Sequence, residues 1–278
     1  MYVVATPIGN LADISLRALE VLGSVDLIAA EDTRHTRKLL SHYNIHKPLV
    51  SYHSQNMQQR GFELVQKIIA GERIALVTDA GTPGISDPGS LLIRQSLEQK
   101  IQVISIPGAA ALITALVTSG LPTQPFAFLG FPPNRGAGRK RFFQAYAGLT
   151  MTSILYESPQ RLKRTLSDLL TFWGDRRIAV ARELTKKFEE QFRGTITEAQ
   201  SHFAEAVKGE ITLVVAGAEP EDANRGEADE WVEQLEELLA DGKTTVKEAA
   251  GMIAAKYRIS RRDVYQKAIQ LQRELGSG

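Results

Sequence analysis

Short apolar runs rich in β-branched residues alternate with helical patterns along the first part of the chain. Four runs predict strands at residues 2–5, 27–30, 74–78 and 103–106, and each ends in a polar or Gly/Pro turn. Between the first two, Leu16, Leu19 and Leu22 share one face of a predicted helix, with Asp13 as its candidate N-cap. This alternation predicts a mostly parallel sheet with helices on both faces.

A second series of elements follows a Gly/Pro-containing connector at residues 120–125. Strands are predicted at 126–130, 153–157, 178–181 and 212–216, with an edge-like strand at 191–196. Helical patterns at 138–147, 160–172 and 197–207 separate them. The shorter connections favour a mixed sheet with antiparallel pairs, so this half predicts a second α/β domain.

The pattern changes again after Gly217. Residues 218–229 are acidic and typical of a linker, and three short helical patterns follow at 230–240, 244–256 and 260–274. We therefore predict an N-terminal α/β domain at 1–120, a second α/β domain at 121–217, and a C-terminal helical, partly basic domain at 230–278.

Composition narrows the class of protein. The 278 residues carry a formal net charge of +1, so contact with nucleic acid must come from local basic patches. The absence of cysteine excludes disulfides, thiolate metal sites and cysteine nucleophiles. The first residues do not resemble a signal peptide, and no apolar run is long enough to span a membrane, so a cytoplasmic location is expected.

The loop from Gly81 to Gly89 is the strongest local signal for a ligand site. It follows a predicted buried strand and combines glycines and prolines with two nearby carboxylates, Asp79 and Asp87. Ligands of open α/β sheets lie beyond the carboxyl ends of strands, and glycines let them approach the backbone. The loop matches neither a phosphate loop nor a dinucleotide fingerprint. The alternative is an ordinary turn between a strand and a helix.

Two other segments lie at predicted strand ends of the first domain. The stretch Glu31-Asp32-Thr33-Arg34 offers carboxylates beside a guanidinium, although a capped helix start explains it equally well. The small residues at 108–111 would allow close approach of a nucleoside, although alanines also suit helix packing.

Two charged segments stand out in the second domain. Residues 181–190 place Arg182 and Glu183 at a predicted strand end, where a solvated face is the alternative. Residues 132–141 form a basic arm suited to a phosphate backbone, with a solubilising surface loop as the alternative. The five histidines show no metal-ligand spacing, so no metal is predicted.

Taken together, these motifs resemble the tetrapyrrole methylase superfamily, the class III methyltransferases. The resemblance runs from about Tyr2 to Gly217 and rests on ATPIGNLAD, AEDTR, TDAGTPGISDPG, IPGAAA, YESP and ARELTKKFEE, in this order. Within the superfamily it is closest to the branch that methylates small-subunit ribosomal RNA. It implies two α/β domains with folded S-adenosylmethionine in the cleft between them, 2′-O-methylation of a cytidine in the decoding centre of 16S ribosomal RNA, and a homodimer.

The resemblance also implies cofactor-binding positions. They lie at the ends of strands in both domains, and they are Pro7, Ile8, Asp79, Ala80, Gly81, Thr82, Ile85, Ala110, Ala111, Tyr156, Ala181 and Ala216.

The catalytic and RNA-binding roles are hypotheses from strand-end position and charge. Asp32 is the first candidate for the base that activates a ribose hydroxyl, followed by Glu31 and Glu183, while Arg34 and Arg182 would hold flanking phosphates. The candidate RNA contacts are the basic residues Arg135, Arg139, Lys140, Arg141, Lys186, Lys187, Arg261 and Arg262. Two alternatives stay open: a methylase of a tetrapyrrole or another small substrate, and a non-catalytic ribosome-assembly factor that binds RNA.

Overall fold

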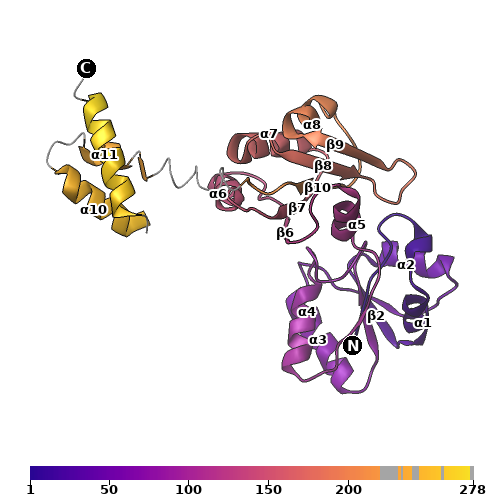
Figure 1. Ribbon diagram of the computed structural model, residues 1–278. Coiled ribbons are helices and arrows are strands. Elements are labelled where there is room, and N and C mark those ends of the chain that lie inside the picture. The colour runs from indigo at the N-terminus through magenta and orange to yellow at the C-terminus, as the bar shows by residue number, and fades with distance from the viewer. Residues whose placement is uncertain (220–230, 233, 240–243, 258–259, 276–278) are drawn as a thin grey trace.

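The computed structural model describes residues 1–219, 231–232, 234–239, 244–257 and 260–275, with side chains up to residue 271. It contains two five-stranded sheets, each in its own α/β unit, and a set of C-terminal helices (Figure 1). The predicted fold class, two α/β domains and a C-terminal helical part, is confirmed.

The first sheet is parallel throughout and has the order β3-β2-β4-β1-β5. Its strands are β1 (Tyr2–Val4), β2 (Leu27–Ala30), β3 (Leu49–Ser51), β4 (Ile74–Val77) and β5 (Ile104–Ile106). Helices α1 (Leu16–Ser24) and α2 (Thr33–His42) pack on one face, and α3 (Met57–Ile69) and α4 (Gly89–Glu98) on the other.

Strand β4 shows why the sheet needs helices on both sides. Ala75 and Val77 join the apolar cluster beneath α1 and α2, whereas Ile74 and Leu76 join the cluster beneath α3 and α4. Successive side chains of a strand point to opposite faces, so a strand that is apolar at every position must be covered twice.

The start of α1 differs from the prediction. The N-cap is Ser15, whose side chain accepts a hydrogen bond from the backbone N–H of Ala18, while Asp13 ends a short 3-10 turn (Leu11–Asp13). The assignment of Asp13 as the cap was wrong because the extra turn delays the helix by two residues.

The second sheet has the order β6-β7-β10-β8-β9, with one parallel pair, β6 and β7, and antiparallel pairing elsewhere. Its strands are β6 (Phe126–Gly130), β7 (Thr152–Glu157), β8 (Arg177–Arg182), β9 (Glu190–Thr195) and β10 (Ile211–Val215). Helices α6 (Ala137–Tyr146), α7 (Leu162–Trp173) and α8 (Ile196–His202) flank it and enclose one apolar cluster.

Helix α5 (Ala111–Thr118) covers the other face of the second sheet, although it directly follows the first. Its side chains Leu112, Ala115 and Leu116 pack in one cluster with Ile154 of β7 and Val214 of β10. The boundary that the sequence predicts at residue 120 therefore assigns α5 to the first domain, although α5 packs on the second sheet.

The C-terminal helices make a separate apolar cluster. Leu235, Ile253 of α10 (Val246–Tyr257) and Val264 of α11 (Arg261–Leu275) are buried in it. Most of the predicted linker at 218–229 lies outside the described residues. In the part of the chain that the structure describes, no helix is both long and apolar enough to cross a bilayer.

Candidate active site

A cavity of about 460 Å³ is lined by residues of both α/β units. Its first-sheet wall comes from segments that follow β1, β2, β4 and β5, which is where open α/β sheets bind ligands. The lining residues are Ile8, Glu31, Thr78, Asp79, Ala80, Gly81, Thr82, Ile85, Ser86, Asp87, Ala110, Ala111, Phe131, Tyr156, Glu157, Ser158, Pro159, Gly209, Glu210, Ile211 and Thr212.

The Gly81–Gly89 loop is stiffened by its own carboxylate. Asp87 accepts hydrogen bonds from the backbone N–H groups of Gly84, at 2.8 Å, and Gly89, at 2.7 Å. Gly81 and Thr6 exchange backbone hydrogen bonds of 3.0 and 2.9 Å, which fasten the loop to the segment after β1. Gly81 has a φ of +85°, which a residue with a side chain rarely adopts. The loop is therefore a preformed wall of the cavity.

Carboxylates gather on this wall. The Thr78 hydroxyl donates to Glu31 Oε2 at 2.7 Å, and the backbone N–H of Asp32 donates to Asp79 Oδ1 at 3.0 Å. Burial raises the pKa of Asp79 and of Asp87 above their usual range. These oxygens can accept hydrogen bonds from the amine and hydroxyl groups of a ligand.

Asp32 and Arg34 point to each other instead of into the cavity. Arg34 Nη2 lies 2.7 Å from Asp32 Oδ2, and Arg34 Nε donates to Asp32 Oδ1 at 3.1 Å. These hydrogen bonds hold the pKa of Asp32 far below its usual range. Asp32 also caps α2, so its carboxylate is engaged on both sides. A carboxylate held this way is a poor proton acceptor.

Arg182 and Glu183 are likewise engaged in pairs beside the cavity. Arg182 Nε donates to Glu190 Oε2 at 2.6 Å, and Lys186 Nζ donates to Glu183 Oε1 at 2.7 Å. The hydrogen bond from Lys186 lowers the pKa of Glu183. Neither Arg182 nor Glu183 is among the lining residues.

Nine of the twelve residues predicted to bind the cofactor line this one cavity: Ile8, Asp79, Ala80, Gly81, Thr82, Ile85, Ala110, Ala111 and Tyr156. Pro7, Ala181 and Ala216 do not line it, and the two alanines pack in the cluster beneath α5. Tyr156 is held in place because its Oη accepts a hydrogen bond from the backbone N–H of Leu112 at 3.2 Å. The cofactor assignments themselves stay predictions.

The second-sheet wall contains residues that were not among the predicted site residues. Phe131 follows β6, and Glu157, Ser158 and Pro159 continue β7 beyond Tyr156. The position of Glu157 at a strand end in the YESP segment was a signal for it, whereas nothing in the local sequence marked Phe131.

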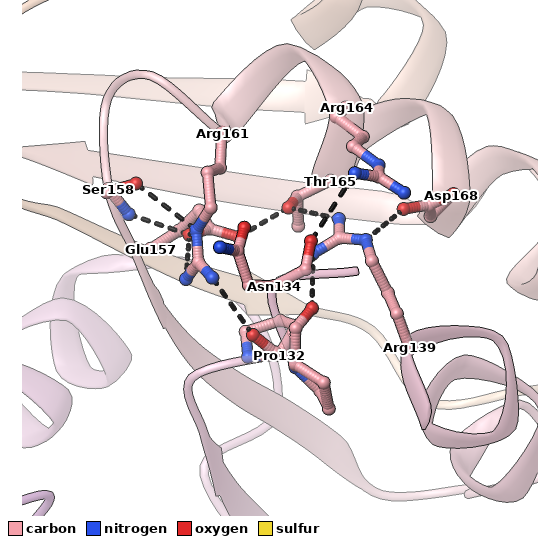
Figure 2. A network of polar contacts seen from close by, with 10 residues as sticks. Pro132, Asn134, Arg139, Glu157, Ser158, Arg161, Arg164, Thr165 and Asp168 are labelled. Carbon is pink, nitrogen blue, oxygen red and sulfur yellow. Dashed lines mark hydrogen bonds and ion pairs between the residues drawn. The ribbon is translucent and has the colours of Figure 1, made fainter. Parts of the chain in front are cut away.

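Glu157 is fully buried within a network of arginines (Figure 2). Arg161 Nε donates to Glu157 Oε1 at 2.7 Å, and the Thr165 hydroxyl donates to Glu157 Oε2. Arg139 Nη2 donates to the same hydroxyl oxygen at 2.8 Å, and Arg139 Nε pairs with Asp168 at 2.6 Å. The network connects the cavity wall to α6 and α7.

Arg139 differs from the other basic residues of the predicted arm. Its side chain is 3% exposed, whereas Arg135, Lys140 and Arg141 are exposed. A buried guanidinium that is already paired with Asp168 cannot contact a phosphate backbone, so Arg139 leaves the set of proposed RNA contacts.

The remaining predicted RNA contacts are divided in the same way. Lys186 is bonded to both Glu183 and Glu210, whereas Lys187 is exposed. Arg261 and Arg262 are exposed on α11. The cationic side chains of Lys187 and of α11 can therefore contact a polyanion, whereas that of Lys186 is already paired with carboxylates.

Known proteins resemble this chain over most of its length. Residues 1–200 match the family described as tetrapyrrole (corrin/porphyrin) methylases. The chain belongs to the tetrapyrrole methylase family. It is 49% identical to the ribosomal RNA small subunit methyltransferase I of Synechocystis sp. (strain ATCC 27184 / PCC 6803 / Kazusa), with 98% of each chain covered. It is 44% identical to the protein of the same name from Bacillus subtilis (strain 168), over 95% of this chain and 92% of that one.

Solved structures show the same fold at low sequence identity. The uroporphyrin-III-C-methyltransferase of Thermus thermophilus matches with a TM-score of 0.56 at 18% identity, covering 77% of this chain and 93% of that one. A diphthine synthase matches with a TM-score of 0.60 at 13% identity, covering 81% and 92%. Members of this methylase fold therefore act on different substrates, so the fold leaves the substrate of this chain open.

Among the described residues, no group of three or more His, Asp or Glu side chains is arranged to hold a metal ion.

Proposed function

We propose that this methylase transfers a methyl group from S-adenosylmethionine to the 2′-hydroxyl of a cytidine in the decoding centre of 16S ribosomal RNA. The observation that carries the proposal is the convergence of nine predicted cofactor residues on one cavity of about 460 Å³. The names of the relatives, which match nearly the whole chain, support small-subunit ribosomal RNA as the substrate, and the cytidine 2′-hydroxyl is what the motif resemblance implies.

The residues of the cavity fit S-adenosylmethionine. The carboxylate of Asp79 complements a cationic ligand that carries amine and hydroxyl donors. Ala110 and Ala111 leave room for a flat ring to approach the start of α5. The bound cofactor supplies an electrophilic methyl group, so the main task of the chain is to align the ribose with it.

Glu31 is the best-placed candidate for the catalytic base. It lines the cavity, whereas Asp32, the first candidate from the sequence, is paired with Arg34 and does not. The hydrogen bond from Thr78 to Oε2 orients the carboxylate. In this proposal Glu31 would accept the proton of the ribose 2′-hydroxyl, while the bound cofactor would supply the methyl group to that oxygen and leave as S-adenosylhomocysteine.

The phosphates of the RNA would contact exposed cations outside the cavity. Arg135, Lys140 and Arg141 surround the start of α6, and Arg261 and Arg262 lie on α11. Several phosphate contacts supply most of the affinity for RNA, and a small tetrapyrrole needs none of them. These positions favour RNA over a small substrate. A homodimer and a cytoplasmic location stay predictions.

Transfer of a radiolabelled methyl group tests the proposal on unmodified 30S subunits, naked 16S RNA and a tetrapyrrole precursor side by side. We expect incorporation into 30S subunits or 16S RNA at one cytidine ribose. Incorporation into the tetrapyrrole alone would assign a small substrate. Calorimetry that detects no binding of S-adenosylmethionine would support a non-catalytic RNA-binding factor.

The base is tested with Glu31→Gln and with Asp32→Asn as its neighbour. Removal of a general base lowers kcat by roughly 10²- to 10⁴-fold, so we expect this loss in Glu31→Gln with cofactor affinity retained. Asp32→Asn keeps the size of the side chain and should retain a much larger share of turnover. Normal turnover in Glu31→Gln would refute the assignment.

A further inference from the structure

Phe131 is a large aromatic side chain that lines the cavity yet remains 50% exposed. Its inner side contacts Tyr156, with ring centroids 5.5 Å apart and planes inclined by 58°. Tyr156 in turn contacts Phe128, with centroids 4.9 Å apart. A row of aromatic rings therefore runs from the second sheet to the cavity, and its last ring is open to solvent.

The backbone turn before Phe131 brings it over the glycine loop of the other unit. Gly130 has a φ of +68° at an irregularity in the pairing of β6 with β7. A Cβ atom at Gly130 would lie 3.7 Å from Ser86 Oγ, so this turn approaches the Gly81–Gly89 loop across the cavity. Phe131 thus lies where the two walls meet.

The segment after Phe131 is held by three arginines, each of which donates to a different backbone carbonyl (Figure 2). Arg161 Nη1 donates to Pro132 at 3.2 Å, Arg139 Nη1 to Pro133 at 3.0 Å, and Arg164 Nη1 to Asn134 at 3.4 Å. Three consecutive carbonyls fastened to α6 and α7 make this segment a firm support. The backbone that follows Phe131 is therefore held in place, and Tyr156 contacts one side of its ring.

Exposed cations follow Phe131 closely in the chain. Arg135, Lys140 and Arg141 lie within ten residues of it and are exposed. Proteins that bind single-stranded nucleic acid combine these two features, a basic surface for the phosphates and an aromatic ring on which a base stacks.

We propose that Phe131 stacks on the nucleobase of the nucleotide that is methylated, and so places its ribose at the cavity. This inference rests on the proposed RNA substrate and adds a residue that selects a nucleotide rather than binding the cofactor. The ring is half exposed, so a planar base can stack on its open side, next to the cavity that the predicted cofactor residues line.

The test compares Phe131→Ala, Phe131→Leu and Phe131→Tyr with Phe62→Ala. Phe62 is 65% exposed on α3 and does not line the cavity, so it controls for loss of an exposed ring. Steady-state kinetics with 30S subunits or 16S RNA, whichever the wild type methylates, give kcat and KM for RNA. Calorimetry gives the affinity for S-adenosylmethionine, and thermal unfolding reports on folding.

Stacking of a base on an aromatic ring is worth about 1–3 kcal/mol by alanine substitution, which corresponds to roughly 5- to 150-fold. We expect kcat/KM for RNA to fall by this factor in Phe131→Ala and Phe131→Leu, with cofactor affinity unchanged. Phe131→Tyr and Phe62→Ala should remain close to wild type. Leucine fills similar apolar space without an aromatic face, so its failure to rescue separates stacking from packing.

Three results would overturn the inference. Rescue by leucine would show that Phe131 only packs against Tyr156. Weaker binding of S-adenosylmethionine in Phe131→Ala would place the ring against the cofactor. Unchanged kinetics in all variants would exclude a role in RNA binding. A wild-type protein that methylates no RNA would instead overturn the proposed function, so the two failures are distinguishable.

Discussion

Replacement of Arg139 by methionine tests whether this cation supports the fold or binds RNA. The substitution keeps most of the apolar stem and removes the guanidinium. In the structure that guanidinium pairs with Asp168 and donates to the Pro133 carbonyl and the Thr165 hydroxyl. All three partners lose a donor in the variant.

The size of the effect follows from the burial of the pair. The side chain of Arg139 is 3% exposed and that of Asp168 is 25% exposed. Removal of one member of a buried ion pair costs about 3–5 kcal/mol, and the partial exposure of Asp168 places this case at the lower end. One apolar cluster joins the two α/β units, and for a cooperative unit of their combined size each kcal/mol lowers Tm by about 2–4 °C. We therefore expect Tm to fall by roughly 6–12 °C.

Arg141→Met is the matched control because Arg141 lies two residues further along α6 and is exposed. Surface substitutions usually change stability by less than about 0.5 kcal/mol. Thermal unfolding and RNA binding at several salt concentrations are measured for both variants. In Arg141→Met we expect an unchanged Tm and a salt slope reduced by about 1. The reverse pattern, with Arg139→Met stable but weak in RNA binding, would refute the reasoning.

Two further predictions concern the first-sheet wall of the cavity. Burial raises the pKa of Asp79 above its ordinary value of 3.8, so its carboxylate form costs stability above the raised pKa, and the cost is gone below 3.8. Asp79→Asn should therefore be at least as stable as wild type at pH 7 and lose that advantage as the pH falls toward 3.8, which urea unfolding across pH checks. The variant should also bind S-adenosylmethionine more weakly, which calorimetry checks. A variant less stable than wild type at pH 7 would contradict the prediction. In Gly89→Ala the new Cβ would lie 2.8 Å from Asp87 Oδ1 and 3.0 Å from the Gly84 nitrogen, so the loop must shift. Turnover should fall by roughly 100-fold while Gly23→Ala, which meets no atom within 4 Å, stays active; equal activity of the two variants would show that the loop tolerates the shift.

The predicted elements came closest to the structure where a continuous apolar run ended in polar residues. Strand β2 occupies the predicted residues 27–30, and β6 occupies 126–130. Strand β3 was not predicted because its three residues are only half-buried at the sheet edge, which leaves too short a pattern. For the second sheet the sequence predicted a mixture of parallel and antiparallel pairs without naming them, since the pairing depends on the connections between strands rather than on any single strand.

The candidate site shows the same division between local and long-range information. The Gly81–Gly89 loop could be found because its composition is unusual within a few residues. Phe131 could not, because its position at the cavity depends on how the second sheet faces the first. The burial of Arg139 depends on Asp168, 29 residues away, and a cation in a basic stretch carries no local sign of such a partner.

Helix α5 has a mechanical consequence for the two halves of the methylase. Residues 107–110 join it to the last strand of the first sheet, yet its apolar side chains pack on the face of the second sheet. A rotation of one half against the other would therefore have to turn about this short stretch, and its last residue, Ala110, lines the cavity. The segment about which the halves would rotate and this part of the cavity wall are therefore the same stretch of backbone. A molecule bound against Ala110 would stiffen the hinge itself, so occupancy of the cavity and the angle between the halves would be coupled without any separate transmitting element.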